Sequence, residues 1–271
     1  MGTVQFGLPY GISNTEGKTS SEEVKKILDL ASSNKIGILD TASAYGNAEE
    51  VIGRELIKDF KIVSKFMPPS AGERILEQLE QSLKRLHLSS LYAYLAHRPL
   101  ELLEYPEQWD ELRSFKSTGK VEKIGFSLNE PEELELLLNA NFIPDLVQVP
   151  YNYFDRRFEA FFKDLKNNDC EIHSRSTFLQ GLFFTKLNEL DNFFEEVKPL
   201  LYQLQKQKDS LPGMLLKFVL ENPFIDKVIL GVESEQQLAQ NLESIKGSFK
   251  MIELKQDISD KILIPSRWPK K

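Results

Sequence analysis

Four polar side chains that could take part in one reaction stand at or just after the ends of three successive apolar segments. The first of these segments ends in Asp40, and Tyr45 follows it in a short turn. The second ends at Lys65 and the third at His97. The carboxyl ends of neighbouring parallel strands meet at one edge of a sheet or one mouth of a barrel. We therefore expect Asp40, Tyr45, Lys65 and His97 to lie together.

This combination of residue types suits the reduction of a carbonyl group. A phenol with a pKa near ~10 is a poor proton donor at neutral pH unless a nearby cation favours its ionised form. Lys65 would supply that cation, Asp40 would hold the ammonium in an ion pair, and His97 would hydrogen-bond the substrate oxygen or the phenol. Each of the four alone is more readily explained as structural. The ordered set favours catalysis.

The stretches around these residues, LDTASAYG, IVSKF and YLAHRP, resemble the aldo-keto reductases, and later segments resemble a bacterial subgroup of that family. The resemblance covers nearly the whole chain. It implies a (β/α)8 barrel and NAD(P)H-dependent reduction of an aldehyde or ketone to an alcohol by hydride transfer, with Tyr45 as the general acid.

Short apolar segments alternate with amphipathic ones from end to end, without a linker or low-complexity tract, which predicts a single α/β domain over residues 1–271. Eight strands fit a (β/α)8 TIM barrel. Members of the family usually have several apolar residues before the equivalent of Gly2-Thr3, so the first strand is expected to be shortened. The expected strands are Thr3–Gly7, Gly37–Asp40, Lys61–Lys65, Leu91–His97, Lys123–Ser127, Leu146–Pro150, Glu171–Arg175 and Lys227–Gly231.

Three helix starts can be predicted from capping residues. Ser20 and Ser234 each precede a Glu or Gln three residues later, which is the pattern of a capping box. Asn129 can cap the helix that follows the predicted strand ending at Ser127.

The family resemblance also implies a set of cofactor contacts in the second half of the chain. Ser127 and Gln148 match residues that hold the carboxamide of the nicotinamide, while Leu128 stands where an asparagine is expected. Arg175 replaces a stacking aromatic residue, and a planar guanidinium can also stack on such a ring. The remaining matches are Ser176, Leu179, Gln180 and Gly181 along the pyrophosphate, and Gly231, Glu233, Ser234, Gln237 and Asn241 around the adenosine.

The sequence leaves two candidates for the dinucleotide. NADPH is the usual cofactor of the family, and a helix N-terminus near Ser234 would favour an anion. Members selective for NADPH often present Lys or Arg there, whereas this chain has Glu233 and Gln237. An acidic side chain suits a 2′-hydroxyl better than a 2′-phosphate. NADH is therefore a serious alternative to NADPH.

Candidate substrate residues are spread over three loops. Tyr10 lies in a turn-rich loop that is either a plain connection or part of the substrate pocket. Arg98, Asn152 and Arg156 would make the mouth polar, and a brief loop after His97 suggests an open pocket for a small-molecule, sugar-like carbonyl compound.

Composition excludes several other classes. Lys and Arg number 34 against 41 Asp and Glu, giving a net charge of −7, which argues against a nucleic-acid or anionic-membrane partner. A single cysteine, Cys170, offers no internal disulfide, and no apolar run reaches the ~20 residues needed to span a bilayer. We expect a cytoplasmic protein. The sequence does not predict its oligomeric state.

Two other functions are rivals to carbonyl reduction. A metal-dependent hydrolase is disfavoured because the three histidines, His87, His97 and His173, form no metal-ligand pattern; His173 alone is better explained as structural. A cofactor-binding regulatory protein on the same barrel, with little or no turnover, is the alternative that stays open. Leu128 and the short first strand are the features that could weaken catalysis.

Overall fold

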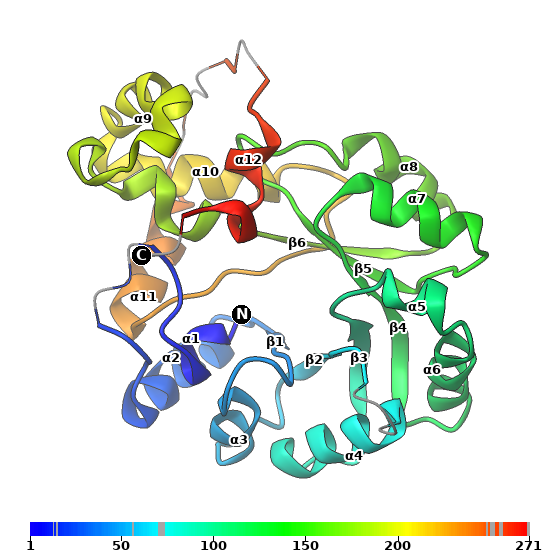
Figure 1. Cartoon of the computed structure of the whole chain (residues 1–271). Helices are drawn as coiled ribbons and strands as arrows, with labels where there is room; N and C mark the ends of the chain where they lie inside the picture. The colour runs from blue at the N-terminus through cyan, green and yellow to red at the C-terminus, as the bar shows by residue number, and fades with distance from the viewer. Residues whose placement is uncertain are drawn as a thin grey trace.

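A curled sheet of parallel strands forms the centre of the protein (Figure 1). The computed structural model describes residues 1–12, 14, 16–55, 57–69, 74–247, 249, 253–254 and 257–269. Seven strands follow one another in chain order, each paired with the next in parallel. They are β1 (Ile38–Asp40), β2 (Lys61–Phe66), β3 (Leu91–Ala96), β4 (Val121–Ser127), β5 (Leu146–Pro150), β6 (Glu171–Arg175) and β7 (Lys227–Val228).

The first three residues of the chain close this sheet into a barrel. Gly2 forms parallel bridges with Asp40 on one side and with Gly231 on the other. The Gly2 amide donates to Leu230 O at 2.8 Å, and the Asp40 amide donates to Met1 O at 2.8 Å. Met1–Thr3 therefore occupies the eighth strand position, and the expected single-domain α/β barrel is confirmed.

The predicted strand Thr3–Gly7 is wrong in its position. Val4–Gly7 forms a short helix, α1, and the extended pairing ends at Thr3. The reason is geometric: Gly2 already pairs with Asp40, the last residue of β1, so Val4 has no strand beside it to pair with. The last predicted strand, Lys227–Gly231, is likewise shortened to two paired residues, β7.

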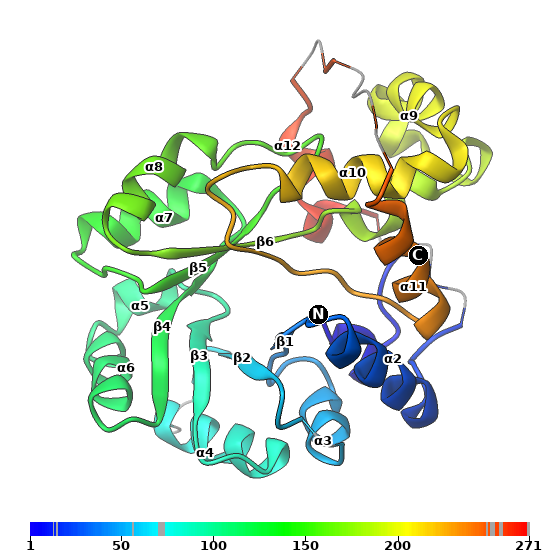
Figure 2. The same ribbon diagram turned by 180° about the vertical axis from the view of Figure 1, so that it is seen from behind.

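Helices follow most strands and cover the outside of the barrel. Figure 1 and Figure 2 show α3 to α6 on one side, with α9, α10 and α12 gathered on the opposite side. Besides α1, the helices are α2 (Ser21–Ser33), α3 (Ala48–Gly53), α4 (Ile75–Leu86), α5 (Glu101–Glu104), α6 (Glu107–Ser117), α7 (Pro131–Asn139), α8 (Glu159–Asn167), α9 (Lys198–Gln205), α10 (Leu211–Leu220), α11 (Glu235–Ser244) and α12 (Asp260–Leu263). Short 3₁₀ segments are η1 (Leu179–Phe184), η2 (Leu187–Glu189), η3 (Asn192–Val197), η4 (Lys208–Ser210) and η5 (Pro265–Arg267).

Capping explains where the helices that approach the barrel mouth begin. Ser20 Oγ accepts from the Glu23 amide, and Ser234 Oγ accepts from the Gln237 amide, each at 3.2 Å, so both residues are N-caps as predicted. The reciprocal bonds of the predicted capping boxes are replaced, because Glu23 Oε1 accepts from the Glu235 amide and Gln237 Oε1 from the Glu233 amide. The prediction for Asn129 is wrong by one residue, because Glu130 and Glu133 form a reciprocal capping box at the start of α7.

Three apolar clusters stabilise the arrangement. The largest packs the helices onto the outer face of the barrel, and a small one, with Val63, Leu95 and Leu146, fills the barrel interior. A separate cluster joins η1, α9 and α10 to the C-terminal segment, where Ile262 and Trp268 are buried. This third cluster fixes the C-terminal segment beside the barrel mouth.

Gly125 permits a close approach of β4 to β5, which yields a test of the packing. A Cβ at this position would lie 1.8 Å from Leu146 O. We expect Gly125→Ala to lower the free energy of unfolding by about 1–3 kcal/mol, measured by urea denaturation. Gly37→Ala is the matched control, because a Cβ there meets nothing within 4 Å. Equal losses in both variants would contradict this packing.

Candidate active site

Four side chains meet where β1, β2 and β3 end. The Lys65 ammonium lies 2.8 Å from Asp40 Oδ2, 2.8 Å from Thr41 O and 3.4 Å from Tyr45 Oη. His97 follows β3 and stands edge-on to the Tyr45 ring, with centroids 5.7 Å apart. The structure therefore brings together Asp40, Tyr45, Lys65 and His97, as the sequence predicts.

Burial and charge determine the protonation of this group. Lys65 is completely buried, which alone would lower its pKa. Asp40 and Tyr45 together outweigh that penalty, so the pKa of Lys65 is raised above its ordinary value and the side chain carries a full positive charge. Burial, followed by the nearby charges of Lys65 and Arg175, lowers the pKa of His97 to about 3. His97 is therefore a neutral imidazole at physiological pH.

The turn that presents Tyr45 is pressed against α1. A Cβ at Gly7 would lie 1.8 Å from Tyr45 O, and Gly46 takes a left-handed φ of +57° with Gly7 O close by. From the other side, the buried carboxylate of Glu49 accepts from Ser64 Oγ at 2.6 Å and from Arg85. These contacts hold the Tyr45 loop directly above Lys65.

A cavity of about 790 Å³ opens above these residues at the barrel mouth. Its volume lies in the range of small-molecule and cofactor sites. Lys65 lies beneath the cavity wall. The sequence-predicted residues that line the cavity are Tyr10, Asp40, Tyr45, His97, Arg98, Ser127, Gln148, Arg175, Ser176, Leu179, Gln180, Gly181, Gly231, Glu233, Gln237 and Asn241.

Gln148 has a contact that the sequence does not predict. Its Nε2 donates to Asp40 Oδ1 at 2.7 Å, so the carboxylate of Asp40 is held by Lys65 on one oxygen and by Gln148 on the other. Gln148 also lines the cavity, as does its neighbour on β4, Ser127. The Leu128 side chain, in contrast, is completely buried in the outer apolar cluster.

Arg175 joins two loops at the edge of the cavity. Its Nη2 donates to Leu128 O and to Asn129 Oδ1, both at 2.6 Å, and Nη1 donates to Ser176 Oγ at 3.2 Å. The guanidinium is thereby fixed in one plane beside the mouth.

The segment after β6 has an unusual backbone where it borders the cavity. Leu179, Gln180 and Gly181 have φ values of 44°, 52° and 90° in succession. Left-handed φ is strained for residues other than glycine and is found preferentially at functional sites. Gln180 Nε2 donates to Tyr10 Oη at 2.9 Å, so this segment is linked to the loop after α1.

Besides Lys65, three predicted site residues do not line the cavity. Asn152 is completely buried, and its side chain bonds the backbone amides of Phe154 and Asp155 and the carbonyl of Ser176, so it shapes a turn. The Arg156 guanidinium lies 4.7 Å from the Phe218 ring centroid. Neither side chain borders the cavity in which a substrate contact was predicted. Ser234 acts as the N-cap of α11 and does not border the cavity.

Several cavity residues were missed from sequence. Gln240 lies one helical turn after Gln237, so the periodicity of α11 could have revealed it. Gln5 was not predicted as a site residue because the sequence analysis placed it inside the expected strand Thr3–Gly7. Asn129, Thr177 and Phe178 lie beside predicted site residues in the sequence, so their neighbours could have revealed them. No local signal marks the others, which include Met67, Phe184, Pro212, Ile264, Pro265 and Ser266.

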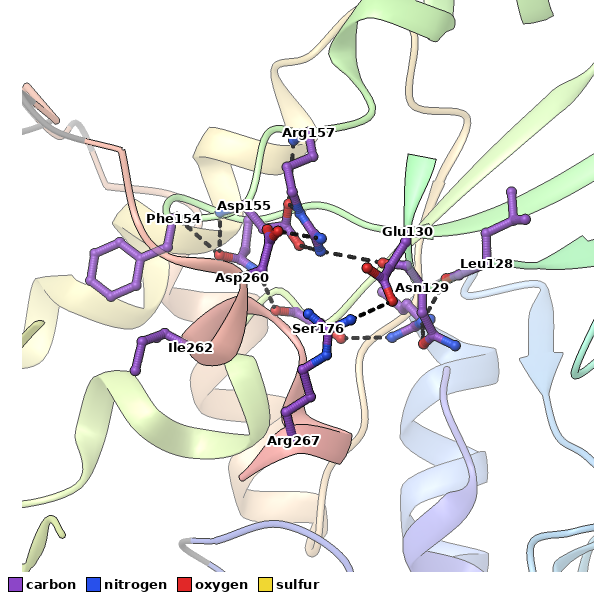
Figure 3. A network of polar contacts seen from close by, with 12 residues as sticks. Leu128, Asn129, Glu130, Phe154, Asp155, Arg157, Ser176, Asp260, Ile262 and Arg267 are labelled. Atoms are coloured by element: carbon purple, nitrogen blue, oxygen red, sulfur yellow. Dashed lines mark hydrogen bonds and ion pairs between the residues drawn. The ribbon is translucent and has the colours of Figure 1, made fainter. Parts of the chain in front are cut away.

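The C-terminal segment is tied to the cavity rim by ion pairs (Figure 3). Arg157 Nη1 lies 3.3 Å from Asp260, and Arg267 Nη2 lies 2.8 Å from Glu130. Arg157 also pairs with Asp155 at 2.9 Å and donates to Asn129 O. These contacts hold Ile264 to Ser266 against the mouth.

Comparison with known proteins identifies the family. The model of the Aldo/keto reductase family matches residues 1–257. The aldo-keto reductase YhdN of Bacillus subtilis (strain 168) is 26% identical over 272 residues, covering 86% of this chain and 80% of that protein. The chain therefore belongs to the aldo/keto reductase family of oxidoreductases.

Solved structures share the fold. The holo form of an aldo-keto reductase from Bacillus halodurans has a TM-score of 0.73 at 20% identity, over 93% of this chain and 87% of that one. An aldo-keto reductase from Klebsiella pneumoniae, solved in complex with NADPH, has a TM-score of 0.66 at 20% identity, over 85% and 81% of the two chains.

Within the described ranges, no helix is both long and apolar enough to cross a membrane. No cluster of three or more His, Cys, Asp or Glu side chains suited to a metal ion occurs in that same part of the chain.

The charge state of His97 can be tested by NMR. We expect its imidazole to remain neutral at pH 5 and to gain a proton only near pH 3. Lys65→Met should raise the pKa of His97, because the Lys65 charge helps to lower it, although burial is the larger cause. Since the unfolded chain binds this proton first, acidification from about pH 6.5 towards 3 should also destabilise the fold through this group. A wild-type His97 that titrates near pH 6.5 would contradict the assignment.

Proposed function

We propose that this protein reduces an aldehyde or ketone to an alcohol by hydride transfer from a reduced nicotinamide dinucleotide, with Tyr45 donating the proton. The observation that carries the proposal is the buried Lys65 ammonium, 3.4 Å from Tyr45 Oη and 2.8 Å from Asp40. This ammonium is placed where it can stabilise the tyrosinate that forms when Tyr45 gives up its proton.

The residues at the barrel mouth fit a dinucleotide. The cavity extends from Tyr45 and His97 to the start of α11, past Ser127 and the Leu179–Gly181 segment. Residues of both ends are needed to hold a molecule with a reactive ring at one end and an adenosine at the other. The relative from Klebsiella pneumoniae crystallised with NADPH supports this class of cofactor.

The proposed chemistry divides between cofactor and protein. When bound, the dinucleotide supplies a hydride to the carbonyl carbon. Tyr45 gives its phenolic proton to the developing alkoxide, and the resulting tyrosinate is stabilised by Lys65. The tyrosinate regains a proton from solvent after the alcohol leaves.

His97 and Asp40 would position these groups. A neutral His97 can donate a hydrogen bond to the substrate oxygen without competing as a proton donor, because it carries no extra proton at physiological pH. Asp40 holds the ammonium of Lys65, and Gln148 holds Asp40. Ser127, Gln148 and Arg175 line the part of the cavity proposed for the nicotinamide.

The substrate proposed is a small polar carbonyl compound such as a sugar aldehyde. Arg98 is exposed at the rim beside His97, and Tyr10 and Met67 complete that end of the cavity. A cationic rim and phenol groups suit hydroxylated or acidic substrates better than wholly apolar ones.

Replacing the phenol tests the general acid. Tyr45→Phe should retain dinucleotide binding, measured by fluorescence, and lose about 10²- to 10⁴-fold in turnover, followed at 340 nm with a panel of aldehydes and aldoses. Tyr202→Phe is the matched control, because Tyr202 is exposed outside the cavity and its turnover should match wild type. Full activity in Tyr45→Phe would remove Tyr45 as the acid, and binding without turnover on any carbonyl would favour the regulatory alternative.

A further inference from the structure

The start of α11 forms the end of the cavity opposite the catalytic group, and three backbone donors there are already occupied by side chains. The Glu235 amide donates to Glu23 Oε1 at 2.7 Å, a carboxylate that comes from α2. The Gln237 amide donates to Ser234 Oγ at 3.2 Å, and the Glu233 amide donates to Gln237 Oε1 at 2.8 Å. A helix N-terminus attracts anions through such free donors. Here the protein's own side chains satisfy three of them.

The charges at this end of the cavity are also unfavourable for an anionic group on a ligand. Glu233 lines the cavity, and the Glu23 carboxylate lies against the same helix N-terminus. Lys26 lies at 3.5 Å from Glu23 and at 3.4 Å from Glu22, and it is half-exposed on the outer side of α2. Arg98 and Arg175 are the cations among the described lining residues, and both lie at the ends of β3 and β6 beside the catalytic group.

Gln5 provides an independent observation at the same end. Its side chain lies over Gly231, so closely that a Cβ on Gly231 would be 2.7 Å from Gln5 Oε1. Gln5 is 8% exposed and lines the cavity, yet its Oε1 has no hydrogen-bond partner. A buried amide oxygen without a donor is costly. A ligand that donates a hydrogen bond to this oxygen would remove that cost.

Gln5 Oε1 is a buried acceptor without a donor, and the Glu233 carboxylate, which accepts from Gln237 Nε2 at 3.3 Å, brings a negative charge to the cavity wall. A ribose with free 2′- and 3′-hydroxyls brings donors to such groups. A 2′-phosphate brings acceptors and a charge of about −1.5 to −2 to the end of the cavity that Glu233 lines and where Glu23 binds the start of α11. We propose, building on the proposed function, that Glu23 and Glu233 make the site selective for NADH over NADPH, with Gln5 accepting a hydrogen bond from the adenosine part.

Binding measurements separate this proposal from catalysis. The dissociation constants of NADH and NADPH are measured by fluorescence on the purified protein. Those of ADP-ribose and its 2′-phosphorylated form, which lack the nicotinamide, are measured by competition. We expect each 2′-phosphorylated ligand to bind at least about 10-fold more weakly than its partner, which is about 1.4 kcal/mol. Equal or tighter binding of the phosphorylated ligands would overturn the proposal.

Variants identify the responsible carboxylates. Glu23→Gln keeps an amide oxygen that can accept from the Glu235 amide, so the cap is retained while the charge is lost. Glu23→Gln combined with Glu233→Lys should strengthen NADPH binding at least about 10-fold relative to NADH. Glu22→Gln is the matched control, because Glu22 shares α2 and the contact to Lys26 and has no bond to α11. An unchanged ratio in the double variant, or an equal shift in the control, would contradict the roles of Glu23 and Glu233.

Gln5 is tested in the same assays. Gln5→Leu removes the acceptor at similar size and should weaken NADH and ADP-ribose alike, with thermal unfolding unchanged or raised because a buried unpaired oxygen is lost. Unchanged affinity for both would remove Gln5 from the site. Failure of the wild-type protein to bind any of the four ligands would refute the proposed function itself, whereas binding with the opposite preference would refute only the selectivity.

Discussion

The completely buried ion pair of Lys65 and Asp40 is the interaction on which the rest of the site depends. Removing an ammonium from water costs several kcal/mol, so it persists in an interior only with close partners of opposite charge and further hydrogen bonds. Asp40, Thr41 O and Tyr45 Oη provide these partners within 3.4 Å. The same burial brings a fixed positive charge next to a phenol and a neutral imidazole, which is the electrostatic basis of the proposed chemistry.

The barrel must be closed for that pair to be buried, and the closure is made by very few residues. Gly2 bridges Asp40 to Gly231, and Met1 O and Asp40 O are both bonded across this seam. Asp40 is therefore a strand-end residue whose backbone completes the barrel and whose carboxylate holds Lys65. A disturbance of the seam would be transmitted directly to the catalytic group.

The cavity is electrostatically divided along its length. Arg98 and Arg175 line its catalytic end, next to the buried Lys65, whereas its far end at α11 is lined by the carboxylate of Glu233 and by neutral amide side chains. The division arises because β2, β3 and β6 end on one side, whereas α2 brings Glu23 against the start of α11 on the other. The α11 end of the cavity can thus discriminate between cofactors, while the proposed reaction takes place at the other end.

The sequence by itself determined the strand order, most strand bounds and the grouping of Asp40, Tyr45, Lys65 and His97, because apolar periodicity and parallel strand ends are local properties. Tertiary structure decided what no local pattern contains. Glu23 and the Glu235 amide are 212 positions apart, and Gln5 acquires its role from packing over Gly231. The helix at Val4–Gly7 and the inward, structural use of Asn152 likewise follow from which neighbours the fold supplies, since a hydrogen bond or a missing strand partner exists only once the chain has closed.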